Sequence, residues 1–424
     1  MRPMQSRQQP EVVNPVLPEA IAPWVRSMAA TFLHDPGNSS VDTWIAQLRA
    51  RWQPERSWGV RDRGSWVATL RTEPRRLTVP GGSGVAPEVA VDALTNVTVA
   101  ATHRRQGLMS RMLRDSLSSA RDRGEVLSVL IAAEWAIYGR FGYAPATLAS
   151  DYVLHRQRPG ARCAGDMAGL RQVSLDEVAG ELSGVFDRER RHWAGQMDRD
   201  PTWWQRNLGL DGTTPRQPPA ANWVVHEGDD GIDGVVGWSP HGAPNLLAPE
   251  QQVEVQILLT ANHTAYRNLW AYLTAIDGVD QVTLSLRPAQ EPVRWLLEDA
   301  RALVATRQYD FLWLRFLDVA AALSSRRYGV EGELVLEVSD PDAGGFASGR
   351  YALIGGPDGA DCSPTRADPD LRVSQRALAS AYLGGFRLPE LAWGGGVSEV
   401  KPGALARADL MFASPRPPWN ATWF

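Results

Sequence analysis

The sequence has 424 residues, of which 44% are hydrophobic and 22% are charged, a soluble composition with room for two or three domains. The formal net charge of −4 leaves no basic excess that could pair with a phosphate backbone, which argues against nucleic acid as a partner. Cys163 and Cys362 lie far apart with no metal-ligand spacing around them, so we expect neither a disulfide framework nor a bound metal.

The N-terminal residues are rich in proline and contain no apolar segment of the kind found in signal peptides, and we expect residues 1–20 to form a flexible tail. No later segment approaches the ~18 uninterrupted apolar residues that cross a bilayer. We therefore expect a cytoplasmic protein without a membrane partner.

The first part of the chain after this tail mixes two periodicities. Apolar residues recur at helical spacing in two segments, and shorter runs with turn residues between them predict strands. The expected helices cover 21–32 and 41–52, and the expected strands cover 57–62, 65–71, 77–79 and 89–91.

The most informative stretch is residues 94–143. An alternating apolar run over 94–99 predicts a strand, a turn with two arginines and a glycine follows, and apolar residues from Leu108 onwards recur at helical spacing. A second apolar run over 126–132 then leads into a loop that contains three aromatic residues, at 138–143. The order is strand, basic turn, helix, strand, tyrosine loop.

A strand that leads through a turn into a helix gathers unpaired backbone N–H groups and the positive end of the helix dipole at one point. Arg104 and Arg105 add positive charge there, and Gly107 lets a ligand approach the backbone, so the turn suits a pyrophosphate without a metal. The alternative is an ordinary strand-turn-helix corner with solvated arginines.

The wider stretch resembles a known family. Val97-Thr98-Val99 followed by Arg104-Arg105-Gln106-Gly107-Leu108-Met109 resembles the acetyl-CoA loop of the GNAT N-acetyltransferases, although Met109 stands where the pattern has a small residue. The segments VTVAATHRRQGLM and AEWAIYGRFGYAPAT together resemble one branch, the Eis-type (enhanced intracellular survival) enzymes. The resemblance implies acetyl-CoA as co-substrate, bound at Val97, Thr98, Val99, Arg104, Arg105, Gln106, Gly107, Leu108 and Met109.

The resemblance also implies an α/β (α+β) fold, in which two tandem GNAT-like domains precede a sterol-carrier-protein-like domain. We expect the catalytic domain at 21–155, a degenerate domain at 156–305 and the last domain at 306–424. A second strand-helix-strand unit repeats the first domain's topology, but its turn over 260–263 contains neither arginine nor glycine. The second domain should therefore not bind CoA. A lipid partner for the third domain is a weak hypothesis.

Acetyl transfer from a thioester needs a proton for the departing thiolate. Tyr138 is the candidate general acid, because a phenol with a pKa near ~10 stays protonated at neutral pH. Tyr143 competes for this role, but in Eis-type enzymes the tyrosine of IYGRFG is the acid, and this tyrosine is Tyr138.

A base is harder to name, because His103 is the only histidine in the stretch. The Eis resemblance implies the C-terminal carboxylate, which in this family reaches back into the first domain's active site. We therefore expect Phe424 to lie in the active site, and the two aromatic residues that end the sequence fit a buried tail.

The residues expected to bind the acceptor depart from the family in two places. Trp423 stands where the best-known aminoglycoside-acetylating members have an acid, and Trp135 replaces a small residue before IYGRFG. An acidic, wide cleft is thus partly replaced by an aromatic, narrower one. The remaining carboxylates that could receive a polyamine are Asp35, Glu134 and Asp42, and the expected cleft-wall aromatics are Phe32 and Trp44.

We therefore expect an acetyl-CoA-dependent N-acetyltransferase that acts on amines of small polycationic molecules, aminoglycosides first. One alternative is an enzyme dedicated to a peptide, a secondary metabolite or a protein lysine, which the two tryptophans favour. Another is a non-catalytic lipid or ligand carrier. The resemblance implies a homo-oligomer, and a hexamer is the preferred form.

Overall fold

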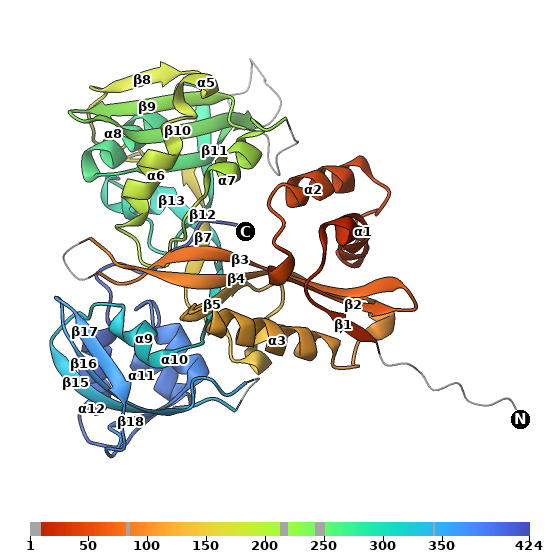
Figure 1. The fold of residues 1–424 in the computed structure, drawn as a ribbon. Coiled ribbons are helices and arrows are strands. Elements are labelled where there is room, and N and C mark those ends of the chain that lie inside the picture. Colours follow the sequence, from red (N-terminus) through yellow and green to blue (C-terminus); the bar gives the residue numbers. More distant parts are fainter. Residues whose placement is uncertain (1–9, 82–84, 213–218, 242–250, 342–343) are drawn as a thin grey trace, which may run out of the picture.

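The computed structural model describes residues 10–81, 85–212, 219–241, 251–341 and 344–424, which form three β-sheets with their helices (Figure 1). This arrangement confirms the predicted α/β (α+β) class. The last residues of the chain lie between the first and the second sheet (Figure 1). Within the described residues, no helix is long and apolar enough to cross a membrane.

The first sheet has the order β1-β2-β3-β4-β5-β14-β6, in which only β4 and β5 are parallel neighbours. The amphipathic helix α3 packs on β3 and β4, and α1 and α2 pack on each other beside β3. The elements are β1 (Glu11–Val13), α1 (Ile21–Thr31), α2 (Ser39–Arg49), β2 (Ser57–Asp62), β3 (Ser65–Thr78), β4 (Glu88–Val99), α3 (Leu108–Asp122), β5 (Leu127–Ile131), β6 (Ala144–Pro145) and β14 (Leu312–Phe316).

The strands of this sheet are longer than the sequence predicts. The segments expected as separate strands at 65–71 and 77–79 form one strand, β3. Arg71 and Arg75 both bind Glu73 within β3, and these mutual ion pairs let the strand continue through a charged run that interrupts its apolar pattern.

The prediction of a flexible tail over residues 1–20 is wrong for its second half. Residues 11–13 are β1, which pairs with β2 at the edge of the first sheet, and Val16 is buried at 1% exposure. A short 3-10 helix, Pro18–Ala20, then leads into α1. Residues 1–9 lie outside the described part of the chain.

The second sheet has the order β13-β7-β12-β11-β10-β9-β8 and repeats the pattern of one parallel pair, β11 with β12, among antiparallel neighbours. Two short helices, α5 and α6, follow β8 and are separated by residues 179–181. The elements are β7 (Leu148–His155), β8 (Leu170–Val173), α5 (Leu175–Val178), α6 (Leu182–Arg190), α7 (Pro201–Leu208), β9 (Asn222–Gly228), β10 (Gly231–His241), β11 (Gln251–Thr260), α8 (His263–Ala275), β12 (Val279–Pro288) and β13 (Leu303–Asp310).

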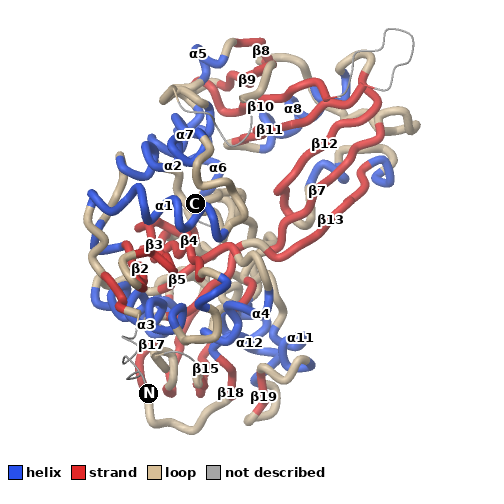
Figure 2. Tube along the Cα trace, turned by 90° about the vertical axis from the view of Figure 1, so that its right-hand side faces the viewer, coloured by secondary structure: helices blue, strands red, loops and turns tan. Residues whose placement is uncertain are grey.

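The chain leaves the first sheet after β6 and returns to it with β14, after the second sheet is complete. β7 follows β6 in the sequence but pairs with β12 and β13 of the second sheet, where these strands run side by side (Figure 2). β14 follows the second sheet's last strand and pairs with β5 and β6 of the first. The second sheet is thus built from consecutive strands, β7 to β13, whereas the first sheet takes its strand β14 from beyond the second.

The third sheet has the order β17-β16-β15-β18-β19 and shares a hydrophobic core with the first sheet. Each sheet with its helices is called a lobe, numbered as the sheets are. The shared core contains Leu127 and Leu314 of the first lobe and Leu336 and Leu378 of the third. The elements are α9 (Val319–Ser324), β15 (Gly332–Ser339), β16 (Gly349–Gly355), β17 (Ala360–Pro364), β18 (Leu371–Ser374), α10 (Gln375–Ala381), α11 (Leu388–Trp393), β19 (Val397–Glu399) and α12 (Ala404–Phe412).

A buried ion pair joins the first and third sheets. Arg315 of β14 and Asp340, just after β15, are both fully buried, and their Nη2 and Oδ2 atoms are 2.9 Å apart. The same guanidinium donates a hydrogen bond to the carbonyl oxygen of Phe141. Arg315 therefore links the third lobe to the loop that follows Tyr138.

We predict that Asp340→Ala lowers the free energy of unfolding by about 3–5 kcal/mol, because it leaves the Arg315 guanidinium buried without its carboxylate. Urea unfolding followed by circular dichroism measures this change. The control is Arg372→Ala, which breaks a more exposed pair with Glu337 and should cost at most about 1 kcal/mol. Equal losses in the two variants would contradict the prediction.

Candidate active site

An opening lies between β4 and β5. The two strands pair only over Val91–Ala93 and Leu127–Val129, whereas β4 continues to Val99. A bulge accompanies this separation, since Asn96 has a φ of +56° and the register with β3 shifts there. Beyond residue 93, β4 pairs with β3 alone among the described strands, so one edge of its backbone is left for a ligand.

The basic turn follows this edge. After a 3-10 helix at Ala101–His103, Arg105 and Gly107 have φ values of +62° and +73°, and α3 begins with no side chain capping its first N–H groups. A Cβ atom at Gly107 would meet no heavy atom within 4 Å, so this glycine faces open space. Uncapped N–H groups beside exposed arginines are suited to binding an anion.

The residues predicted around this turn differ in exposure. Arg104, Arg105, Gln106 and Gly107 are exposed, whereas Leu108 is buried in the core under α3 and Met109 is half-buried. On β4, Val97 and Val99 are half-buried, and the Thr98 hydroxyl is buried 2.6 Å from that of Thr69. The backbone is thus the accessible part of Val97–Val99. His103 turns away towards Asp62, 3.1 Å from its Nε2 atom.

Tyr138 ends the short helix α4 (Trp135–Tyr138) and is half-buried. Burial raises the pKa of its phenol to about 12. Tyr143, 6.2 Å away between ring centroids, is fully buried, and its hydroxyl is 2.6 Å from that of Ser128. Within the described part of the chain the Tyr138 hydroxyl has no hydrogen-bond partner, so it is the better placed of the two to meet a ligand.

The tyrosine loop is held by the third lobe. Gln375, at the start of α10, donates a hydrogen bond of 2.7 Å to the carbonyl of Gly142, and Arg315 donates to that of Phe141. The Arg376 side chain lies so close to Gly139 that a Cβ atom there would be 3.3 Å from its Nη2 atom. The position of Tyr138 therefore depends on residues more than 170 positions away in the sequence.

The C-terminal segment, residues 419–424, lies at the junction of the first and second lobes. The Thr95 hydroxyl of β4 donates a hydrogen bond of 3.1 Å to the main-chain oxygen of Phe424, one residue before the bulge. Trp203 of α7 donates to the carbonyl of Trp423 at 2.9 Å. The last residue is thus bound to the strand that borders the opening.

Two of the predicted acceptor residues lie against neighbouring positions of one segment. The Trp135 ring packs edge-on against Trp313, with 4.9 Å between centroids, and Trp423 packs in the same way against Phe311, at 5.1 Å. Positions 311 and 313 face the same side where the backbone is extended. Trp135 and Trp423 are 56% and 38% exposed, so both present aromatic surface. Glu134 is also exposed.

The other predicted acceptor residues belong to α1, α2 and the loop between them. Phe32 is 46% exposed, Asp35 accepts a hydrogen bond from the Gly37 N–H, and Trp44 packs against His34. Asp42 forms an ion pair with Arg26. No hydrogen bond, ion pair or ring contact among the described residues joins these side chains to Glu134 or Trp135.

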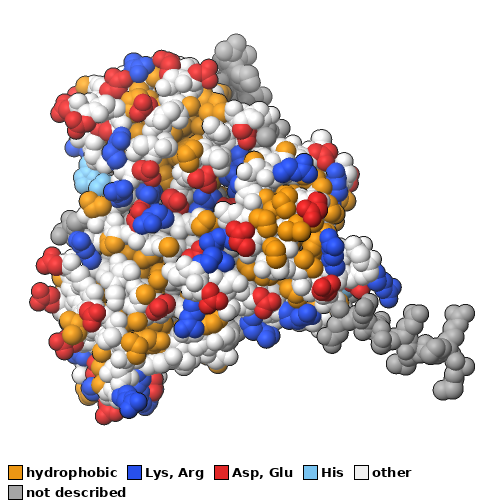
Figure 3. All heavy atoms as spheres, viewed as in Figure 1, with side chains coloured by type: hydrophobic (Ala, Val, Ile, Leu, Met, Phe, Trp, Pro, Cys, Tyr) orange, Lys and Arg blue, Asp and Glu red, His pale blue; other side chains and the backbone are white. Residues whose placement is uncertain are grey.

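A charged cluster beside the C-terminal residue was not predicted from the sequence. Glu73 of β3 binds Arg51, Arg71 and Arg75, and Arg75 also binds Asp200 of the second lobe. Burial alone would raise the pKa of Glu73, but the guanidinium groups hold it well below its usual range. Figure 3 shows further acidic and basic side chains on the surface where the first and the second lobe meet. The run of charged residues over 71–76 is the feature of the sequence that could have indicated this cluster.

Arg71 pairs across the sheet with Thr95, so both side chains lie on one face, next to Phe424. The cluster contains three arginines and two acids. Among the described residues, no group of three or more His, Cys, Asp and Glu side chains could hold a metal ion.

Comparisons with known proteins agree with this architecture. Family models described as acetyltransferase (GNAT) domains match residues 13–146 and 195–315, and a sterol carrier protein domain model matches 319–421. The chain is 35% identical to an uncharacterized N-acetyltransferase of Streptomyces avermitilis, over 97% of this chain and 98% of that protein. It is 33% identical to N-acetyltransferase Eis of Mycobacterium tuberculosis, over 82% and 83% of the two chains.

Solved structures give the same result. The crystal structure of Eis1 from Mycobacterium abscessus superposes with a TM-score of 0.84 and 27% identity, and covers 98% of this chain and 100% of that one. A GCN5-related N-acetyltransferase from Kribbella flavida, at 21% identity and a TM-score of 0.75 over 99% of both chains, shares the fold. From its two acetyltransferase domains, its sterol carrier protein domain and its relatives, the chain belongs to the Eis-type N-acetyltransferases of the GNAT superfamily.

Proposed function

We propose that this acetyltransferase transfers the acetyl group of acetyl-CoA to an amine of a small polycationic molecule, aminoglycosides first, with Tyr138 as general acid and the carboxylate of Phe424 as base. The observation that carries the proposal is the hydrogen bond from Thr95 to Phe424, which supports a terminal carboxylate at the opening between β4 and β5. The other elements of the site lie around this opening.

The turn and the free edge of β4 fit the co-substrate. The uncapped N–H groups of α3, together with Arg104 and Arg105, would hold the pyrophosphate, and the open space at Gly107 allows its approach. The backbone of Val97 and Val99 would pair with the pantetheine arm as an added strand. A backbone N–H at this edge can also support the oxygen of the thioester.

Transfer then needs two proton movements. As the amine attacks the thioester carbonyl, the Phe424 carboxylate accepts a proton from the amine, and the Tyr138 phenol donates its proton to the departing thiolate. The raised pKa of Tyr138 keeps this proton in place over the whole working pH range. Tyr143 is unsuited because its hydroxyl is already paired with that of Ser128.

A dedicated, narrower acceptor is a second candidate. It is supported by the exposed rings of Trp135 and Trp423, which rest on Trp313 and Phe311 and add aromatic surface where an acidic cleft is expected. Thiol release from acetyl-CoA with a panel of amines, read together with product mass spectrometry, distinguishes an aminoglycoside acetyltransferase from this alternative. Absence of thiol release with every amine would contradict both.

Assembly into a homo-oligomer, as a hexamer, stays a prediction. Two large apolar side chains support it, because Trp393 is 95% exposed and Trp295 is 84% exposed, and an interface would cover such surface. Light scattering of the purified protein measures the mass directly.

We predict that Gly107→Ala raises the KM for acetyl-CoA about tenfold, because a Cβ atom disfavours the left-handed backbone by about 1–2 kcal/mol. The matched control is Gly124→Ala at the other end of α3, where φ is +81° and the space is equally open. Both variants should lose similar thermal stability. An unchanged KM in Gly107→Ala would argue against a pyrophosphate at this turn.

Tyr138→Phe should lower kcat by about 10²-fold or more, because it removes the proton donor while the ring keeps its packing. Since the pKa of Tyr138 is raised to about 12, the wild type should show no loss of kcat from this group between about pH 7 and pH 10. Steady-state kinetics across pH provides both values. Tyr143→Phe is the control, and the assignment fails if it lowers kcat as strongly as Tyr138→Phe.

Adding two residues after Phe424 should lower kcat by about 10²-fold while acetyl-CoA binding is retained, because the carboxylate is displaced from Thr95. Thr95→Val should give a smaller loss, about tenfold, since it removes one hydrogen bond to a charged group. Calorimetry measures binding, and thiol release measures kcat. Thr43→Val, at a half-buried position on α2, is the control, and full activity of the extended chain would exclude this base.

A further inference from the structure

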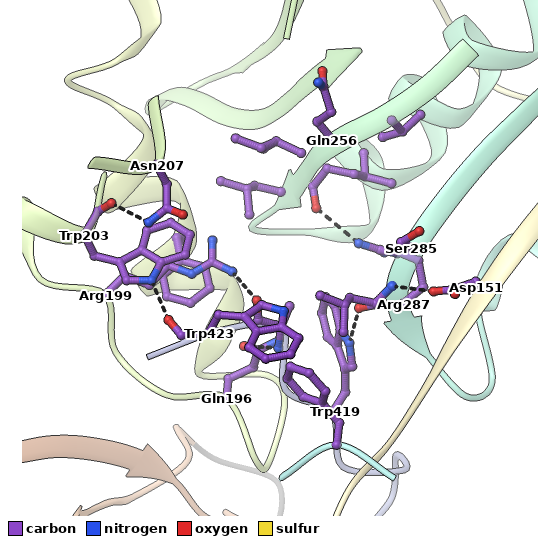
Figure 4. Close-up of a pocket in the computed structure, with 18 of the residues that line it drawn as sticks. Asp151, Gln196, Arg199, Trp203, Asn207, Gln256, Ser285, Arg287, Trp419 and Trp423 are labelled. Carbon is purple, nitrogen blue, oxygen red and sulfur yellow. Dashed lines mark hydrogen bonds between the residues drawn. The ribbon is translucent and has the colours of Figure 1, made fainter. Parts of the chain in front are cut away.

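A cavity of about 560 Å³ lies between the second sheet and the C-terminal segment (Figure 4). Its walls are formed by β11, β12, β13, α6 and α7, by Trp419, Ala421 and Trp423 of the C-terminal segment, and by Ile131 and Ala132 at the end of β5. This volume is in the range of small-molecule sites. The second lobe has no phosphate turn, so the acetyl-CoA site does not account for the cavity.

Three residues that line the cavity have buried side-chain atoms without hydrogen-bond partners. Within the described residues, Glu189 Oε2, Gln196 Nε2 and Trp204 Nε1 are unpaired, although these residues are only 4%, 1% and 4% exposed. Buried polar groups are normally satisfied, so three unpaired atoms around one cavity point to a missing partner. One of them accepts and two of them donate.

Glu189 is the most informative of the three. Its Oε1 atom accepts hydrogen bonds from the N–H and the hydroxyl of Thr260, at 3.2 and 3.4 Å, which fixes the carboxyl group. Its other oxygen is left for a donor from outside the chain. Burial raises the pKa of Glu189 to about 7, although the guanidinium groups of Arg287 and Arg199 act in the opposite direction.

The same walls hold the C-terminal segment. Gln196 accepts a hydrogen bond from the N–H of Ala421 through Oε1, so its unpaired Nε2 belongs to an amide that is already anchored. Trp203 donates to the carbonyl of Trp423, and Arg199 donates to that of Ala421 at 3.1 Å (Figure 4). A molecule in the cavity would therefore touch the residues that position Phe424.

We propose that this cavity is a second ligand site, for a small molecule that presents an amine to Glu189 and hydroxyl or carbonyl oxygens to Gln196 and Trp204. Binding at the cavity does not require the proposed function. An effect of the bound molecule on turnover does rest on the proposed function, because the molecule would act through the segment that ends in Phe424. The amine is either the distal part of the acceptor or a separate effector.

The probes are glucosamine, which carries an amine beside hydroxyl groups, and N-acetylglucosamine, which has the same ring without a free amine. Calorimetry with the full chain should show saturable glucosamine binding at about 1 mM or below, and much weaker binding of N-acetylglucosamine. Glu189→Gln should weaken glucosamine binding about tenfold, and Trp204→Phe should weaken it several-fold. Glu227→Gln, an exposed change outside the cavity, should leave it unchanged.

Tyr138→Phe separates this site from the catalytic one. It should lower turnover and keep glucosamine binding, so that binding is measured without consumption of the probe. If glucosamine is acetylated and Glu189→Gln raises its KM, the cavity holds the acceptor, whereas an unconsumed glucosamine that alters kcat for another amine is an effector. Unaltered affinity in a folded Glu189→Gln variant, or no binding of glucosamine, overturns the proposal. Glucosamine binding to a protein that acetylates none of the amines tested refutes the proposed function alone.

Discussion

The architecture depends on the way the C-terminal segment is held between two lobes. The Arg199 guanidinium is packed among aromatic rings of α6 and α7, and burial lowers its pKa to about 9, so it needs strong acceptors. It finds them in the Ala421 carbonyl and the Thr422 hydroxyl, both at 3.1 Å. Because Thr95 of the first sheet binds Phe424, this segment ties the second lobe to the opening between β4 and β5.

The third lobe also supports the site, on the side of the opening where the tyrosine loop lies. The buried pair of Arg315 and Asp340, together with Gln375, supports the backbone of the tyrosine loop at Phe141 and Gly142. Removing two charges from water is costly, and such a pair is better understood as fixing one geometry than as adding stability. The third lobe is therefore part of the support of the site, whatever else it binds.

Local patterns made much of the fold predictable, and long-range pairing did not. The strand, turn and helix over 94–122 follow from periodicity and from one glycine, because these signals lie within a few residues of each other. The placement of β7 in the second sheet and of β14 in the first was not predictable, since a short apolar run fits either sheet equally well. The charged cluster at Glu73 was missed because two of its members, Arg51 and Asp200, lie outside β3 in other segments of the chain.

The positions of β7 and β14 also decide where the chain can be divided. The segment matched by the first acetyltransferase model, residues 13–146, ends before β7 and lacks β14. Cut at that boundary, β5 would keep β4 but lose β14 and expose an apolar strand edge, which is a template for aggregation. The segment matched by the second model, 195–315, carries the missing strand but lacks β7, and so leaves β12 and β13 apart. The smallest fragment that closes both sheets therefore runs through the two acetyltransferase domains without a break.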